Sequence, residues 1–289
     1  LYIISLTMKK YALLSIDVED WHHCDYFSSI KTNKNYSMLD GLNNFLEIVE
    51  SHGIPSTLFT LSDVAPLIKD ELCNAINNNH EVSSHGVSHK RPLTISKSDF
   101  IEELKVSKDS LEDIIGSQVL GYRAPCFNIN NELTEELTNT GYKYDSSAMA
   151  FSSHPLYGDI DLSFFNKKMD NVYQNEFLTE FELPTTKLLN QNIPISGGGY
   201  LRIFPWLLMK KLVSDFLKIN QTYFFYIHPF ELSNKALPKV DNVSFLTNFR
   251  FKHGQTETPK KLNNLIDLLK LNNFEFVTFK SLMEISKKT

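Results

Sequence analysis

YALLSIDVED, residues 11–20, joins a short apolar run to three carboxylates within four positions. An apolar run that stops at a charged residue predicts a buried strand ending at Asp17. Further strands are expected at 56–61 (STLFTL), 81–84 (EVSS), 118–122 and 223–227 (YFFYI). Because helical patterns lie between these runs, the sequence predicts a parallel sheet or a (β/α) barrel whose two faces are covered.

The helical patterns are amphipathic, as in 100–115, where Leu104, Leu111 and Ile115 share one face. Other helices are expected at 39–51, 62–79, 131–140, 205–219 and 258–271, followed by a strand at 274–279 and a helix at 281–286. Barrels of about 250 residues commonly form one domain, so we interpret 1–289 as a single domain. The region 146–200 is less regular and is expected to be an insertion or loop over the strand ends. SGGGY, residues 196–200, is expected to be a flexible turn where backbone approaches a ligand.

Chemically capable side chains follow five of the predicted strands directly. These residues are Asp17, His85, Arg123, Asp145 and His228. In α/β barrels the carboxyl ends of the strands carry the active site. The coincidence across five strands therefore predicts an enzyme.

Composition excludes several other classes of protein. The net charge is −5 and basic residues occur only in short pairs, which excludes a non-specific nucleic-acid binder. No apolar stretch reaches about 18 residues, so no membrane span is expected. The three cysteines are far apart and form no CxxC pair, which favours a reducing compartment. The apolar residues 1–7 precede the lysines at 9 and 10, the reverse of a secretory signal, so a cytoplasmic location is expected.

Two imidazoles and a group of carboxylates suggest a metal site. On one helical turn His85 and His89 would share a face and could bind one ion, and the carboxylates of 17–20 could supply a third ligand and a base. Arg123 could hold a catalytic carboxylate in its charged form, and His228 could protonate a leaving group. Taken singly, each element also has an ordinary structural interpretation, such as a surface histidine pair, an acidic loop, a salt bridge or a buried histidine.

Taken together and in order, four motifs resemble a known family. SIDVED (15–20), SHGVSH (84–89), RAPCF (123–127) and YIHPF (226–230) are similar to the motifs of polysaccharide deacetylases with a NodB-homology domain, carbohydrate esterase family 4. GYKYDSS (141–147), the stretch 182–206 and HPFEL (228–232) resemble a subgroup found with exopolysaccharide and surface-glycan biosynthesis. The resemblance implies a distorted (β/α) barrel of about seven strands. It also implies metal-dependent hydrolysis of N- or O-acetyl groups on a sugar or glycan.

The resemblance also implies roles for individual residues. Asp17 would be the general base, Arg123 would orient it, and His228 would be the general acid. His85 and His89 would bind the metal, and a backbone N–H near Cys126 would help to stabilise the oxyanion.

The first motif departs from the family's commonest pattern. Val18 follows Asp17 where many members have a second aspartate, so the carboxylate ligand must be Glu19 or Asp20. A strand-like path places Glu19 on the same side as Asp17, and we prefer it, with Asp20 as the alternative. Two histidines and a carboxylate suit Zn²⁺ first, and also Co²⁺, Ni²⁺ or Fe²⁺.

Substrate contacts and oligomeric state are the least specified features. The partner is expected to be an acetylated sugar or glycan, with contacts from Trp21, Cys126, Asp145 and Tyr200. The sequence leaves the oligomeric state open. Two other functions remain: a metal-dependent amidohydrolase acting on a small cyclic amide or imide, and a glycan-binding protein whose catalytic site has drifted. A mere binder would need neither Arg123 nor His228, which argues against the last of these.

Overall fold

The computed structural model describes residues 9–27, 30–151 and 155–288. Residues 1–8, on which the expected absence of a secretory signal rests, lie outside that part of the chain. Within the described ranges, no helix combines the length and apolar character that crossing a bilayer requires.

The sheet contains seven parallel strands in the order β11-β1-β2-β3-β4-β5-β8, and the antiparallel β7 and β6 extend it at one edge. A further strand, β12, pairs in parallel with the start of β1. The strands of this sheet are β1 (Lys10–Val18), β2 (Thr57–Thr60), β3 (Glu81–Ser84), β4 (Gly121–Tyr122), β5 (Tyr144–Asp145), β6 (Asn166–Met169), β7 (Val172–Gln174), β8 (Thr179–Phe181), β11 (Thr222–Ile227) and β12 (Phe274–Phe276). The curled sheet confirms the predicted distorted barrel.

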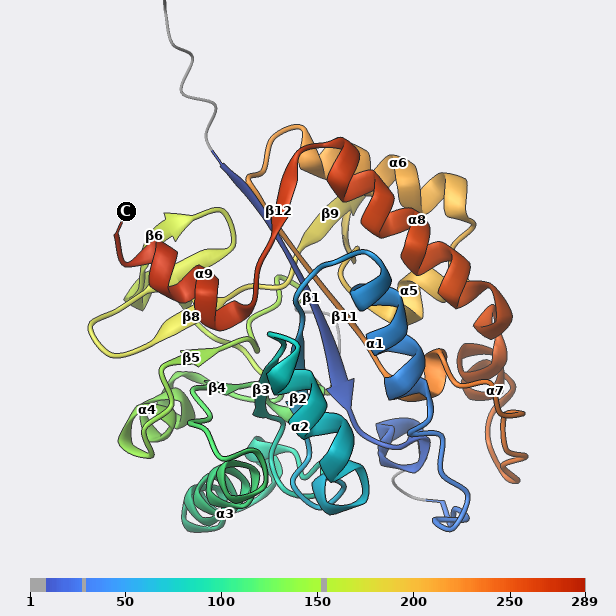
Figure 1. Ribbon diagram of the computed structural model, residues 1–289, viewed down its shortest axis with the longest axis horizontal. Coiled ribbons are helices and arrows are strands. Elements are labelled where there is room, and N and C mark those ends of the chain that lie inside the picture. Colours follow the sequence, from blue (N-terminus) through green and yellow to red (C-terminus); the bar gives the residue numbers. More distant parts are fainter. Residues whose placement is uncertain (1–8, 28–29, 152–154, 289) are drawn as a thin grey trace, which may run out of the picture.

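Helices surround this sheet (Figure 1). They are α1 (Gly41–Ser51), α2 (Lys69–Asn77), α3 (Lys97–Ile115), α4 (Asn131–Asn139), α5 (Gly198–Ile203), α6 (Trp206–Leu217), α7 (Phe245–Lys252), α8 (Thr258–Leu271) and α9 (Phe279–Ser286). Local signals set their ends, as in α3. The Ser96 side chain accepts a hydrogen bond from the Asp99 N–H at its start, and Gly116 ends it in the left-handed conformation.

β1 positions the site because its side chains alternate between two surroundings. Leu14 and Ile16 pack in the large core between sheet and helices, whereas Leu13 packs inside the barrel with Phe59 and Phe224. Two and four residues beyond Leu13, the same face carries Ser15 and Asp17. The barrel interior is therefore aromatic and aliphatic around the middle of β1 and polar at its carboxyl end.

The region 146–200 contributes both to the barrel and to a separate hairpin. β8 pairs in parallel with β5, whereas β9 (Thr185–Leu188) and β10 (Gln191–Pro194) form a two-stranded antiparallel sheet. The prediction of a flexible turn at 196–200 was wrong in its second half, because α5 begins at Gly198.

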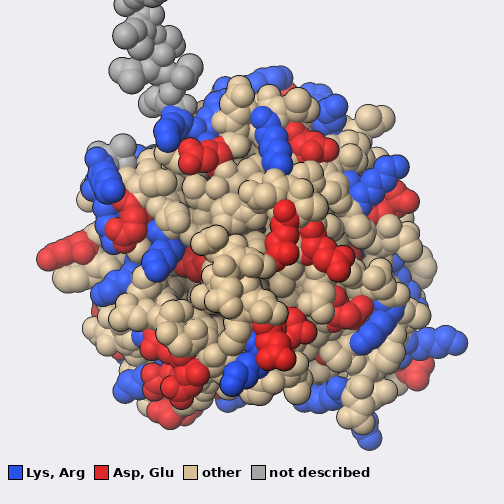
Figure 2. All heavy atoms as spheres, in the orientation of Figure 1, with Lys and Arg blue, Asp and Glu red and all other residues tan. Residues whose placement is uncertain are grey.

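Over the face seen in Figure 2, acidic and basic side chains are interspersed.

Candidate active site

A buried ion pair lies at the carboxyl end of β1. Arg123 follows β4, and its Nη1 donates to Asp17 Oδ1 at 2.6 Å and to Ser15 Oγ at 3.0 Å. Asp17 is 2% exposed and Arg123 is fully buried. A buried charge is tolerated only when it is paired and hydrogen-bonded, so this contact fixes both side chains.

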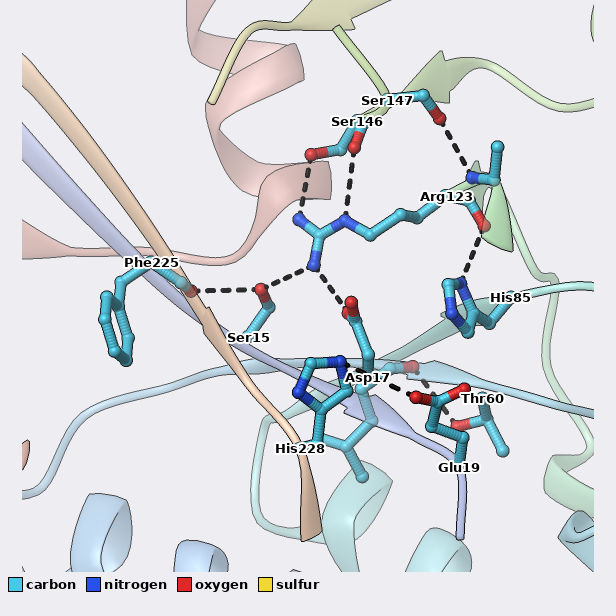
Figure 3. Close-up of polar contacts among 12 residues, drawn as sticks. Ser15, Asp17, Glu19, Thr60, His85, Arg123, Ser146, Ser147, Phe225 and His228 are labelled. Carbon is cyan, nitrogen blue, oxygen red and sulfur yellow. Dashed lines mark hydrogen bonds and ion pairs between the residues drawn. The ribbon is translucent and has the colours of Figure 1, made fainter. Parts of the chain in front are cut away.

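The other two nitrogens of Arg123 also donate hydrogen bonds. Nε donates to the Ser146 carbonyl at 3.1 Å and Nη2 to the Ser146 hydroxyl at 2.8 Å, as Figure 3 shows. The guanidinium carbon lies 4.0 Å from the centre of the Phe59 ring. Asp17 therefore meets a guanidinium that its other contacts hold in one orientation.

Glu19, His85 and His89 converge beside this pair. One ligand atom from each lies within 4.8 Å of those of the other two. His89 Nε2 lies 2.8 Å from Glu19 Oε2. The expectation that the two histidines share a helical turn was wrong, because 85–89 forms a loop in which Gly86 and His89 have φ values of 88° and 62°. The loop, instead of a helix, brings the imidazoles together.

A hydrogen bond from its other ring nitrogen orients the ligand candidate His85. His85 Nδ1 lies 2.8 Å from the Arg123 carbonyl oxygen. Because a carbonyl only accepts, Nδ1 carries the proton and Nε2 is left free to bind a cation. Arg123 thus positions a carboxylate through its side chain and an imidazole through its backbone.

The electrostatics of the cluster fit a cation. Burial by itself would raise the pKa of Glu19, but His89, His228 and His85 lower it to about 2. Burial lowers the pKa of His85 to about 4, so at neutral pH its imidazole is uncharged, as a metal ligand must be. Glu19 Oε2 is buried, and among the described residues it has no aligned hydrogen-bond donor, although His89 is close. A buried carboxylate oxygen without a donor is the group that a divalent ion would satisfy.

His228 reaches the cluster from the end of β11. Its Nε2 lies 3.6 Å from Glu19 Oε1, and its Nδ1 lies 3.1 Å from Glu231 Oε2. Burial would lower the pKa of His228, but the hydrogen bond and charge of Glu231, with the charges of Glu19 and Asp17, raise it to about 9. The structure therefore brings Asp17, Glu19, His85, His89, Arg123 and His228 into one connected group.

Asp20 points elsewhere. Its Oδ1 accepts hydrogen bonds from the N–H groups of Trp21 (2.8 Å) and Met38 (2.9 Å), so it caps the short 3-10 helix η1 (Trp21–His23). The geometry favours Glu19 over Asp20 as the carboxylate ligand.

Two of the four expected substrate contacts are buried. Trp21 is 1% exposed, packs edge-on against Phe27 and donates its indole N–H to the Tyr36 carbonyl at 2.6 Å. Asp145 is fully buried and accepts from the Ser147 hydroxyl at 2.7 Å. Neither side chain offers a surface to a sugar, which corrects their predicted role as substrate contacts.

The other two expected contacts retain some exposure. Cys126 lies in the 3-10 turn η5 (Pro125–Phe127) with φ of 54°, and burial raises the pKa of its thiol. Tyr200 lies on α5 beside the ring of Phe204, at 5.8 Å between ring centres. Their contact with substrate stays a prediction.

Sequence reasoning missed several supporting residues. Ser15, Ser146 and Glu231 hold the groups above, and Arg202 in turn holds Glu231. A signal for Glu231 exists, because a glutamate three residues after the start of a turn is the spacing of a capping box. Arg202 has no local signal.

Comparison with known proteins agrees with this architecture. Residues 36–144 match the family model described as polysaccharide deacetylase, and residues 146–284 match a domain of unknown function, DUF3473. A peptidoglycan deacetylase of Helicobacter pylori (strain ATCC 700392 / 26695) is 27% identical over 117 residues. That match spans 40% of this chain and 40% of the relative.

Solved structures extend the likeness to nearly the whole chain. A Mycobacterium smegmatis protein described as a polysaccharide deacetylase gives a TM-score of 0.66 at 15% identity, covering 99% of this chain and 93% of its own. The peptidoglycan deacetylase PdaC of Bacillus subtilis gives a TM-score of 0.52 at 14% identity, covering 97% and 93%. At these identities the likeness shows the fold, which is the NodB-homology barrel. Residues 36–144 are therefore similar to the polysaccharide deacetylases, and the chain as a whole shares the fold of the solved structures named here.

Proposed function

We propose that the protein is a metal-dependent hydrolase that removes N- or O-linked acetyl groups from a sugar or glycan. The observation that carries the proposal is the convergence of Glu19, His85 and His89 beside the buried pair of Asp17 and Arg123. Two imidazoles and one carboxylate are a ligand set typical of catalytic zinc. The same donors suit Co²⁺, Ni²⁺ or Fe²⁺.

Asp17 is the proposed general base. When bound, a divalent cation supplies Lewis acidity to the acetyl carbonyl and to the attacking water. Asp17 accepts the proton of that water, and Arg123 holds the carboxylate in one orientation through the 2.6 Å contact. Arg123 therefore acts on the reaction through Asp17.

His228 is the proposed general acid. Its Nδ1 faces Glu231, which leaves Nε2 directed toward Glu19 and the ligand cluster. From there Nε2 gives its proton to the departing nitrogen or oxygen. A backbone N–H near Cys126, in the turn that follows Arg123, is the proposed oxyanion donor.

The proposed substrate is an acetylated glycan of surface-polysaccharide biosynthesis. The motif similarity to the exopolysaccharide-associated subgroup supports this, as do the relatives named for peptidoglycan and polysaccharide. A cytoplasmic location is part of the proposal and is supported by Cys24, Cys73 and Cys126, which are unpaired thiols.

An acetate-release assay tests the function. The purified protein is stripped with a chelator, reloaded with Zn²⁺ and given N-acetylated chito-oligosaccharides, O-acetylated oligosaccharides and a small cyclic imide. We expect metal-dependent acetate release from at least one acetylated sugar. Ring opening of the imide without acetate release would instead establish the amidohydrolase alternative.

The altered first motif favours one further candidate, a glycan-binding protein without turnover, because Val18 stands where many family members carry an aspartate. The intact contact between Arg123 and Asp17 and the position of His228 argue against it. Calorimetry that detects sugar binding by a zinc-loaded protein that releases no acetate would support this candidate over the hydrolase.

A further inference from the structure

The residue three positions after His228 folds back onto it. β11 ends at Ile227, and the 3-10 turn η7 (Pro229–Glu231) returns the carboxylate of Glu231 to the imidazole. Oε2 accepts from the His228 backbone N–H at 3.1 Å and lies 3.1 Å from His228 Nδ1. An ionised carboxylate only accepts, so Nδ1 donates to Glu231, and Nε2 faces Glu19 and the ligand cluster.

The second oxygen of Glu231 is also committed. Oε1 accepts from Arg202 Nε at 2.9 Å, and the side chains of Glu231 and Arg202 are 1% and 3% exposed. The remaining nitrogens of Arg202 donate to backbone carbonyls at the end of α7, namely those of Arg250 (2.8 Å), Phe251 (3.1 Å) and His253 (2.8 Å). The carboxylate therefore has contacts on both oxygens, and its position is set from α5 and α7.

The glycine-rich segment makes room for this carboxylate. A Cβ atom at Gly198 would lie 2.2 Å from Glu231 Oε2 and 2.8 Å from Ile227 Cγ1. At Gly199, the next residue, a Cβ atom would have nothing within 4 Å. Gly198 is thus required by the contact with Glu231, whereas Gly199 is not.

We propose that Glu231, held by Arg202 and accommodated by Gly198, is a positioning residue that fixes the imidazole of His228 with Nε2 toward the reacting groups. The inference rests on the proposed role of His228 as general acid. Gly198 and Arg202 then support the imidazole of His228 through Glu231, whereas the sequence had suggested that backbone in this segment approaches a ligand.

Substrates with different leaving groups test this role. A sugar amine or alkoxide needs a proton to depart, whereas the nitrophenolate of 4-nitrophenyl acetate does not. Glu231→Gln should lower kcat for the acetylated glycan about 100-fold with KM nearly unchanged, and lower aryl acetate hydrolysis less than about threefold. Equal losses on both substrates would mean that Glu231 only supports the fold.

The two glycines provide a matched pair. Gly198→Ala should reproduce the selective loss on the glycan, because the added methyl group displaces the Glu231 carboxylate. Gly199→Ala should behave like the unchanged protein, since its methyl group meets open space. Unequal effects in the opposite order would contradict the proposed packing.

A spectroscopic readout separates the two proposals. In ¹H–¹⁵N NMR, the Nδ1–H of His228 should give a slowly exchanging ring signal in the unchanged protein, and this signal should be lost or broadened in Glu231→Gln. If the unchanged protein releases no acetate but the signal behaves in this way, the proposed function fails and the positioning stands. An unaltered signal in Glu231→Gln overturns the positioning whatever the activity.

Discussion

Two buried arginines each hold a carboxylate at the site, and their other partners differ. We call these two clusters the Arg123 side and the Arg202 side. Arg123 binds Asp17 and also donates hydrogen bonds to the carbonyl and hydroxyl groups of Ser146. The Phe59 ring lies against its guanidinium. Arg202 binds Glu231, and its other nitrogens donate to three backbone carbonyls at the end of α7, those of Arg250, Phe251 and His253. Both arrangements satisfy a guanidinium that burial would otherwise penalise heavily.

The difference lies in what each carboxylate does next. Asp17 stands beside the ligand candidates and acts directly in the proposed reaction. Both oxygens of Glu231 are occupied by Arg202 and His228, so Glu231 acts only through the imidazole. The same kind of ion pair, an arginine with a carboxylate, thus holds a reacting group at Asp17 and a positioning group at Glu231.

The largest expected effect is on the Arg123 side. Asp17→Asn keeps an acceptor for Arg123 but removes the base, so kcat for acetate release should fall about 10²–10⁴-fold, at or beyond the loss for Glu231→Gln. Steady-state kinetics on a shared acetylated substrate measures this, with metal content and circular dichroism as controls for the fold. A turnover equal to that of the unchanged protein would remove Asp17 from the mechanism.

We expect His85, and not His228, to be needed for metal binding. His85→Ala removes a ligand and should weaken Zn²⁺ affinity by more than about 10–100-fold, the range seen for changes in supporting groups alone. His228→Ala should keep the metal while losing turnover, because its ring faces Glu19 without completing the ligand set. Elemental analysis after dialysis distinguishes the two, and metal retained in His85→Ala would refute its role as a ligand.

The choice between the two acidic ligand candidates can be made in the same assay. Glu19→Gln should lose metal. Asp20→Asn should keep it, because the Asp20 side chain caps η1 and contacts the Met38 N–H. The reverse result would make Asp20 the ligand.

Replacing each arginine by lysine should lower stability by comparable amounts. Lysine keeps the charge but cannot reproduce the planar set of donors, so we expect Arg123→Lys and Arg202→Lys each to lower the free energy of unfolding by about 1.5–3 kcal/mol. Urea denaturation measures both. A loss confined to one variant would mean that the two clusters are not equivalent in stability.

The Arg123 side could be predicted from the sequence because its groups follow strands directly. An apolar run ending in Asp17, and strands ending at His85 and Arg123, place all three at one edge of a parallel sheet. The predicted helical path for His85–His89 failed because Gly86 and His89 adopt positive φ. A glycine beside the first histidine was the available signal.

The Arg202 side was not predictable in the same way. The partners of Arg202 lie 29–51 residues further along the chain, so no local spacing reveals them. α7 was also missed, because Phe245 and Leu246 are exposed and give no clear apolar face. Its last carbonyls are capped by Arg202, and that contact exists only in the folded protein.

A third buried carboxylate site differs from the two arginine clusters, because in the described structure it forms no salt bridge. Asp145 on β5 and Glu180 on β8 are paired neighbours and fully buried. Burial raises the pKa of Asp145 to about 6, and burial with the charge of Asp145 raises the pKa of Glu180 well above its usual range. Glu180 Oε1 accepts from the N–H groups of Ser147 and Ala148, at 3.0 and 2.8 Å.

The smallest expected effect is therefore a pH-dependent one at Glu180. A carboxyl group with a raised folded-state pKa contributes stability that is fully present below its unfolded pKa, near 4.5, and is lost as pH rises through the folded pKa. The unchanged protein should lose stability from this pair as pH rises through about 6 and beyond. Glu180→Gln keeps an acceptor for the two N–H groups and gives Asp145 a donor. It should raise Tm at pH 8 by about 2–4 °C and leave it nearly unchanged at pH 4. Glu176→Gln, at an exposed position in the connection between β7 and β8, is the matched control and should shift neither value. A lower Tm at pH 8 in Glu180→Gln would show that the ionised pair, in spite of its burial, stabilises the barrel.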